Sequence, residues 1–220
     1  MNTTGKTRRL TLMAMFAAMA YVIMAVGRFP ISSVDFLKYD PKDVVLAIAA
    51  FILGPMPGLA ITVVVSVLEM LTVSSTGPIG LLMNVLSSAA FICPAAALYK
   101  RRHTLRGAAL GLSLGVVAMT ALMLLWNYFV TPYYMGYPRE AVAAMLVPVF
   151  LPFNLVKGCL NAAITMLIYK PVSRALKKSG LVEFQAGSAP QKKSAVGASL
   201  IALLVLVSCI FAVLIMRGIL

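Results

Sequence analysis

The chain has 220 residues, of which 61% are hydrophobic and only 11% are charged. Charged residues make up about a quarter of an average soluble protein, so this composition excludes an ordinary soluble domain and predicts an all-α integral membrane protein. The net charge of +13 does not indicate a nucleic-acid-binding protein, because the basic residues occupy short stretches between apolar runs.

Six apolar runs predict a six-helix transmembrane bundle. The second run is short, and Asp40 is placed to cap a helix whose first residue is Pro41. Glycine and proline then break the chain over 54–58. The six predicted spans are residues 10–26, 41–53, 59–73, 79–98, 105–130 and 142–169.

The C-terminal part of the chain differs in composition from the first 178 residues, which we expect to form the six-helix membrane domain. Residues 179–194 are rich in Gly, Ser, Pro and Gln, as expected of a flexible cytoplasmic linker. Residues 195–220 form an extra hydrophobic helix, and the run 195–216 is long enough to span the bilayer as a seventh helix.

Lys and Arg predict the orientation of the spans. With a cytoplasmic N-terminus, thirteen of the nineteen basic residues lie on the cytoplasmic side, within 6–9, 100–106 and 170–193. Lys157 then lies in the outer half of the sixth span. The basic residues expected outside are Arg28, Lys38, Lys42, Arg139 and Arg217, and the acids expected there are Asp35, Asp40, Asp43 and Glu140.

Lys157 is the most informative residue, because a charge at membrane depth costs roughly 2.5–3.5 kcal/mol. Asn154, Lys157 and Asn161 are spaced i, i+3 and i+7, so they share one face of a helix. No acid is near Lys157 in the sequence. The face therefore requires either a polar ligand or a partner on another helix.

Three further polar residues are expected at a similar outer depth. Asn84 and Asn127 either line a cavity with Lys157 or bond neighbouring helices. Glu69 is either a residue of the membrane interface or a cavity wall able to pair with Lys157. An outward-facing cavity is the resulting hypothesis.

Two outer loops hold the remaining ligand-binding candidates. Tyr39 and Asp40 belong to a segment that is either a capped, solvated loop or part of the site. The tyrosines of these loops either belong to the aromatic belt of the membrane interface or stack on a planar ligand; they are Tyr39, Tyr133, Tyr134 and Tyr137.

Two other patterns concern partners and chemistry. Ala14 and Ala18, at i and i+4, allow close helix approach to either a partner subunit or another helix of this chain. The sequence has one histidine and no phosphate-binding loop or catalytic motif, so we expect neither an enzyme nor a catalytic cofactor. The three cysteines lack metal or redox spacing, and no metal site is expected.

Taken together, several segments resemble the riboflavin-specific S component of energy-coupling factor (ECF) transporters. They are Lys-Tyr-Asp-Pro-Lys-Asp at 38–43, Gly-Pro-x-x-Gly at 54–58, Thr-Gly-Pro-Ile-Gly at 76–80 with Asn84, Asn127 before Pro-Tyr-Tyr at 132–134, and Pro-Phe-Asn-x-x-Lys-Gly at 152–158. The likeness covers residues 10–178 in the same order.

The resemblance implies a six-helix bundle that binds riboflavin as transported ligand in an outward-facing cavity. It also implies three partners: a transmembrane coupling subunit and two cytoplasmic ATPases. Asn154 and Lys157 match positions that bind the flavin ring in that family, as does Asn127. Ala14 and Ala18 match its small-residue motif, which packs against the coupling subunit. The extra helix departs from the family pattern.

Two alternatives remain at this point. One is an S component for another vitamin, such as thiamin or biotin. The other is a stand-alone secondary transporter, although an ion-coupled carrier usually needs intramembrane acids and the predicted spans offer only Glu69.

Overall fold

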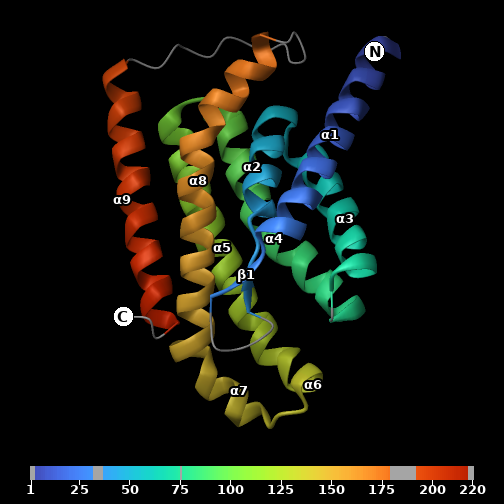
Figure 1. Cartoon of the computed structure of the whole chain (residues 1–220), viewed down its shortest axis with the longest axis vertical. Helices are drawn as coiled ribbons and strands as arrows, with labels where there is room; N and C mark the ends of the chain where they lie inside the picture. Colours follow the sequence, from blue (N-terminus) through green and yellow to red (C-terminus); the bar gives the residue numbers. More distant parts are fainter. Residues whose placement is uncertain (1–2, 32–36, 75, 179–191, 218–220) are drawn as a thin grey trace.

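The computed structural model describes residues 3–31, 37–74, 76–178 and 192–217, and its ribbon is a bundle of long helices (Figure 1). Six helical segments in the described part are long and apolar enough to cross a membrane. The prediction of an all-α membrane protein is therefore confirmed. The helices are α1 (Thr3–Gly27), α2 (Lys42–Leu53), α3 (Pro55–Thr72), α4 (Gly77–Arg102), α5 (Leu105–Phe129), α6 (Thr131–Met135), α7 (Arg139–Met145), α8 (Leu151–Lys178) and α9 (Lys192–Met216).

The short helix α2 forms the centre of the bundle. Ten of its twelve residues are buried, and it packs against α1, α3, α4 and α8. Gly54 ends it with φ +99°, a conformation that favours glycine, and Pro55 starts α3 at once. The predicted break between the second and third spans is therefore a direct turn from one helix into the next.

A two-stranded hairpin lies between α1 and α2. Strand β1 (Phe29–Pro30) pairs antiparallel with β2 (Lys38–Tyr39). After it, Asp40 accepts a hydrogen bond at 3.1 Å from the backbone N–H of Lys42, as expected of a capping residue. The structural N-cap position is Pro41, which places the start of α2 one residue later than predicted.

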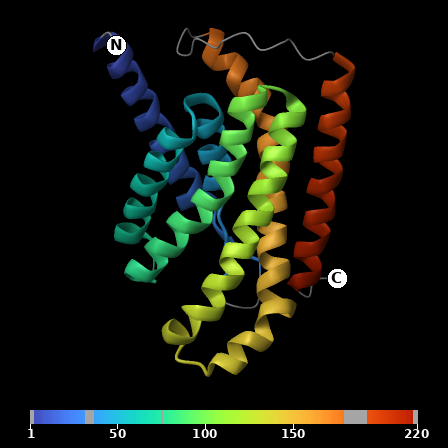
Figure 2. The same cartoon turned by 180° about the vertical axis from the view of Figure 1, so that it is seen from behind.

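Helices α4 and α5 pack closely side by side (Figure 2). Gly111 and Gly115 make this possible. A Cβ atom on Gly115 would lie 2.3 Å from the carbonyl oxygen of Phe91, and one on Gly111 would lie 2.7 Å from that of Ala95. A larger residue at either position would push the two helices apart.

The outer loop expected at residues 131–140 contains the helix α6 and the start of α7. Within the predicted sixth span, a π-helical turn, Leu146–Phe150, connects α7 to α8. Pro148 lies inside this turn and has no N–H to donate, so the regular helical hydrogen-bond ladder is interrupted there. The chain therefore enters α8 through a widened turn just before Asn154.

Helix α9 packs along α8 on the outside of the bundle (Figure 1). It starts at Lys192, three residues before the predicted helix start at 195, and residues 179–191 of the predicted linker lie outside the described residues. Cys209 of α9 joins a buried apolar cluster with Phe153 and Leu160 of α8. The division into a 1–178 domain and an added helix stays a prediction.

Candidate functional site

A cavity of about 300 Å³ lies between α3, α4, α5, α6, α8 and the hairpin. This volume is at the lower end of the roughly 300–1,000 Å³ that small-molecule pockets occupy. Its apolar wall includes Leu37, Met83, Met123 and Phe153. Its polar wall includes Arg28, Asp40, Glu69, Asn84, Ser87, Asn127, Asn154 and Lys157. Five of the predicted ligand-binding residues besides Lys157 therefore meet at one place: Asp40, Glu69, Asn84, Asn127 and Asn154.

Helix α8 contributes the two residues that the sequence pattern ranked first. Asn154 is buried, and its side-chain amide donates to the carbonyl of Phe150 at 2.7 Å. One turn later, Lys157 lies 3.6 Å from Asp43 and makes no hydrogen bond to any residue that the structure describes. The side-chain carbonyl of Asn154 and the ammonium of Lys157 thus retain hydrogen-bonding capacity toward the cavity.

Two further amides come from α4 and α5. Asn127 accepts a hydrogen bond from Thr131 at 2.9 Å through its carbonyl oxygen, which leaves its N–H groups for another partner. Asn84 makes no hydrogen bond within the described part of the chain. Amides from three helices therefore surround the same space as Lys157.

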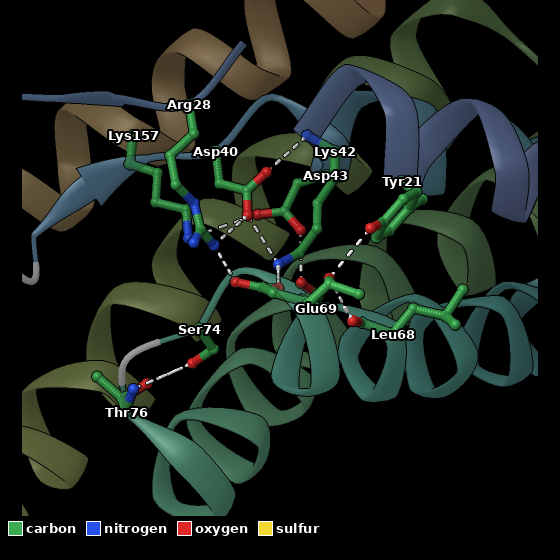
Figure 3. A network of polar contacts seen from close by, with 12 residues as sticks. Tyr21, Arg28, Asp40, Lys42, Asp43, Leu68, Glu69, Ser74, Thr76 and Lys157 are labelled. Carbon is green, nitrogen blue, oxygen red and sulfur yellow. Dashed lines mark hydrogen bonds and ion pairs between the residues drawn. The ribbon is translucent and has the colours of Figure 1, made fainter. Parts of the chain in front are cut away.

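Six charged residues form a buried network beside the cavity (Figure 3). Lys42 contacts Asp40 at 2.7 Å and also pairs with Glu69. Arg28 contacts Asp40 at 3.2 Å and pairs with the other oxygen of Glu69. Together with the Lys157–Asp43 pair, the network holds three cations and three anions. It is formally neutral, which reduces the high cost of burying each charge.

This network refines two sequence expectations. Lys42 and Asp43, expected toward the outer side, are 1% and 0% exposed, because α2 turns into the bundle directly after Asp40, so they are not part of a solvated loop. Glu69 is a cavity wall as proposed, but it pairs with Arg28 and Lys42 rather than with Lys157. The partner of Lys157 is Asp43, on another helix.

Two groups of the hairpin segment have displaced pKa values. Burial raises the pKa of the Asp40 carboxyl, but Lys42, Lys157 and Arg28 outweigh burial, and the pKa lies below its ordinary value. Burial, with the nearby Asp43 and Asp40 charges, raises the pKa of Tyr39. Asp40 is therefore a carboxylate at neutral pH, and Tyr39 is a protonated hydrogen-bond donor.

Tyr39 and Asn161 lie behind the cavity wall rather than in it. The Tyr39 hydroxyl donates to the Asn161 carbonyl at 2.8 Å, and the Asn161 amide donates to Asp43 at 3.4 Å. Ser88 also donates to Asp43. These contacts hold the carboxylate that faces Lys157, so the predicted face of α8 divides into residues that line the cavity and one that supports them.

Tyr133, another predicted site residue, is 78% exposed and accepts a hydrogen bond from Arg139 at 3.2 Å. The neighbouring Tyr134 lines the cavity instead. The sequence offered both tyrosines as candidates, and the phase of the short helix α6, which has proline in its first turn, determines which of them faces the cavity.

Sequence reasoning missed Arg28 and Ser87 as wall residues. Both line the cavity, and both carry a buried polar atom without a hydrogen-bond partner: the Nε of Arg28 and the hydroxyl of Ser87. Buried polar atoms are nearly always paired, so these two point to a ligand with complementary polar groups. Among the described residues, no group of three or more metal-ligating side chains occurs.

Ala14 and Ala18 lie elsewhere, on α1. Both side chains are exposed, whereas Phe16, Ala17 and Ala20 of the same helix are buried. The small-residue pair therefore faces away from the bundle. The alternative of packing within the described part of this chain is disfavoured.

Comparison with known proteins identifies the family of the chain. The family model described as "ECF transporter, substrate-specific component" matches residues 8–169. The chain belongs to this family. A solved structure described as the S component of a bacterial ECF transporter superposes with a TM-score of 0.68, at 29% identity, over 78% of this chain and 99% of that one. This protein is thus a multi-pass membrane subunit of an ECF transporter.

Two curated relatives are riboflavin transporters. The riboflavin transporter FmnP of Bacillus subtilis (strain 168) is 33% identical over 174 residues, which are 74% of this chain and 91% of the relative. The riboflavin transporter RibU of Staphylococcus aureus (strain TCH60) is 30% identical over 180 residues, 79% of this chain and 94% of the relative. The family match ends at residue 169, before α9 begins.

Proposed function

We propose that this subunit captures riboflavin for import. The observation that carries the proposal is the meeting of Asn84, Asn127, Asn154 and Lys157 around one cavity. The relatives named above as riboflavin transporters support the same ligand.

The cavity suits the chemistry of riboflavin, which combines a planar apolar tricycle, a uracil-like polar edge and a hydroxylated chain. The uracil-like edge carries both donors and acceptors, and the free groups of Asn127, Asn154 and Lys157 match them. Met83, Met123 and Phe153 provide apolar surface for the rings. Asp40, Glu69 and Ser87 are suited to the hydroxyls of the chain.

The same polar wall makes the cavity selective, because it raises the free energy of binding of ligands that lack matching groups. A ligand without the matching polar edge would leave buried amides unpaired, at a cost of about 1–3 kcal/mol for each group. A ligand with its own net charge would also disturb a network that is neutral when the cavity holds an uncharged molecule. An uncharged riboflavin avoids both costs.

The sequence contains no phosphate-binding loop for ATP hydrolysis, so ATP-driven import would require partner subunits. The partners we propose are a transmembrane coupling subunit and two cytoplasmic ATPases, with the exposed Ala14 and Ala18 of α1 packed against the coupling subunit. The excess of Lys and Arg predicts that the basic start of α1 and the α4–α5 connection lie in the cytoplasm. The cavity, at the α6 end of the bundle (Figure 1), then faces outward.

The direct test is a ligand titration of the purified chain in detergent. Quenching of flavin fluorescence should saturate at one riboflavin per chain, and thiamin or biotin in excess should not displace the flavin. Absorbance of a copurified flavin offers an independent check. Displacement by thiamin or biotin, or an absence of flavin quenching by a folded sample, would overturn the assignment of riboflavin.

A further inference from the structure

A second hollow lies on the opposite side of the bundle, between α5, α8 and α9, with a volume of about 560 Å³. Small side chains form much of its wall: Ala109 on α5, Ala162 and Ala163 on α8, and Ala198 and Ala202 on α9. The hollow shares no lining residue with the riboflavin cavity. It is a separate apolar groove on the surface that faces the membrane.

The groove exists because α9 rests on α8 and touches α5 only slightly (Figure 2). Only 11% of the membrane-spanning window of α9 is buried, so most of this helix faces lipid. The contact between α8 and α9 lies deeper along the groove, where Val205 and Cys209 join the apolar cluster around Leu160. Toward the start of α5, Leu105 and Ala109 of α5 and Ala198 of α9 line the groove.

Among the described residues that line the groove, Arg106 is the one that carries a charge. It is exposed, and it forms no ion pair within the described residues. Three more cations, Lys100, Arg101 and Arg102, end α4 directly before it. Of the six acids, the four in described segments are far from this end: Asp40, Asp43 and Glu69 in the buried network and Glu140 on α7 (Figure 1). The mouth of the groove is therefore a cationic site without an acidic counterpart in the described structure.

We propose that the groove binds one anionic phospholipid, with an acyl chain along the alanine-lined wall and the phosphate at Arg106. An occupant of this site must be apolar along its length and anionic at one end. It must also be present in the membrane. An anionic phospholipid of the leaflet that contacts the α4–α5 connection has all three properties, and the volume lies in the range that holds a group of this size.

The lipid would also explain how a helix outside the family match is held in place. Among the residues that the structure describes, no ion pair joins α9 to α5, and the sequence of α9 contains no side-chain amide. An acyl chain between them would fill space that is otherwise lined by small residues, and packing would then continue from α5 through the lipid to α9. The lipid is in this sense a structural ligand of the added helix.

The test uses the full-length chain, purified in detergent, delipidated and titrated with dioleoyl-phosphatidylglycerol or dioleoyl-phosphatidylcholine. Native mass spectrometry should detect one bound phosphatidylglycerol per chain, with affinity about fivefold or more above that of phosphatidylcholine. Arg106→Gln should remove most of this preference. Ala109→Trp and Ala198→Trp, on facing walls, should each reduce lipid occupancy at least severalfold by filling the groove.

Matched controls separate these effects from general damage. Arg139→Gln removes a cation at the other end of the bundle, and Leu125→Trp enlarges an exposed position on the far half of α5. Both should retain the lipid and its preference. Thermal unfolding shows which groove variants are folded. One folded tryptophan variant, at either position, is enough to test whether filling the groove removes the lipid.

Three outcomes would overturn the proposal. The two phospholipids could bind equally well, lipid occupancy could persist in a folded groove-filling variant, or the chain could appear as a lipid-free dimer. The last result would assign the groove to a second copy of the chain. None of these outcomes bears on riboflavin, whose cavity shares no residue with the groove.

Discussion

The ammonium nitrogen of Lys157 lies 3.6 Å from a carboxylate oxygen of Asp43, across the contact between α8 and α2. The carboxylate is already held by Ser88 and Asn161, whereas the ammonium has no hydrogen-bond partner in the described structure. Asp43 therefore compensates the charge of Lys157 without occupying its donors. This arrangement leaves a cation in the cavity wall that is both tolerated in the membrane and free to bind a ligand.

The first prediction separates these two roles. Lys157→Met should raise the riboflavin Kd roughly 10- to 150-fold, because a hydrogen bond to a charged group contributes about 1.5–3 kcal/mol. The double variant Lys157→Met/Asp43→Asn restores neutrality and should recover thermal stability without recovering affinity. Fluorescence titration and thermal unfolding measure the two effects. Lys170→Ala, near the other end of α8, is the control. Full recovery of affinity in the double variant would show that Lys157 only neutralises Asp43.

The second prediction uses two unpaired hydroxyls. Ser87 and Ser66 both carry a buried hydroxyl without a partner, but only Ser87 lines the cavity. Ser87→Ala should weaken riboflavin binding about 2- to 10-fold, the value of a neutral hydrogen bond. Ser66→Ala should leave the Kd unchanged. Equal Kd values for the two variants in the same titration would remove Ser87 from the site.

The third prediction concerns the surface of α1. Ala14→Leu or Ala18→Leu should block close approach of the coupling subunit, so that ATP-driven riboflavin uptake falls while binding by the isolated chain survives. Ala121→Leu, an equally small exposed position on α5, should leave both unchanged. Loss of binding by the isolated α1 variants would contradict a partner surface.

The fourth prediction concerns the added helix. No residue in the described part of α9 lines the riboflavin cavity, so truncation after Lys178 should leave the riboflavin Kd within a few-fold. The unfolding temperature should fall, because the apolar cluster around Leu160 and Cys209 loses one side. A truncated chain that unfolds at the same temperature as the full chain, or that is folded and no longer binds flavin, would count against this description.

The fifth prediction tests how α9 sits on α8. Cys159 of α8 packs against the apolar cluster that contains Cys209 of α9, so mild oxidation in membranes should join the two thiols in an intramolecular disulfide. With a protease site introduced into the 179–191 segment, the two halves of the chain should then migrate together until reduced. Cys159→Ser should abolish the link, and Cys93→Ser should not. Separation of the halves after oxidation of the unmodified pair would show a different packing of α9.

The helices could be predicted from sequence because apolar length is a strong signal in a membrane protein. The cluster of Asn154 and Lys157 could also be predicted, because a lysine inside an apolar run is costly without a reason. Helical spacing placed Asn161 on the same face, but spacing alone does not distinguish a cavity wall from the layer behind it.

The charge network could not be predicted in the same way. Lys42 and Asp43 follow a loop and begin a short helix, so local sequence placed them at the outer side. Their burial depends on α2 turning inward among four other helices, which is a tertiary property. Arg28 and Ser87 were missed for a related reason: neither is unusual in its local sequence, and only the folded wall leaves their polar atoms unpaired.

Helix α2 also determines on which side of the membrane the rest of the chain emerges. With twelve residues it is too short to be counted among the six apolar spans, yet it carries the chain back along the bundle between α1 and α3 (Figure 1). A topology drawn from hydropathy alone would omit α2 and invert every connection after it. It would put the basic α4–α5 connection and the start of α1 on opposite faces of the membrane. When α2 is counted, the α4–α5 connection and the start of α1 lie on the same face, and the end of α9 lies on the other. A topology reporter fused after α9 should therefore report the opposite side of the membrane from one fused before α1.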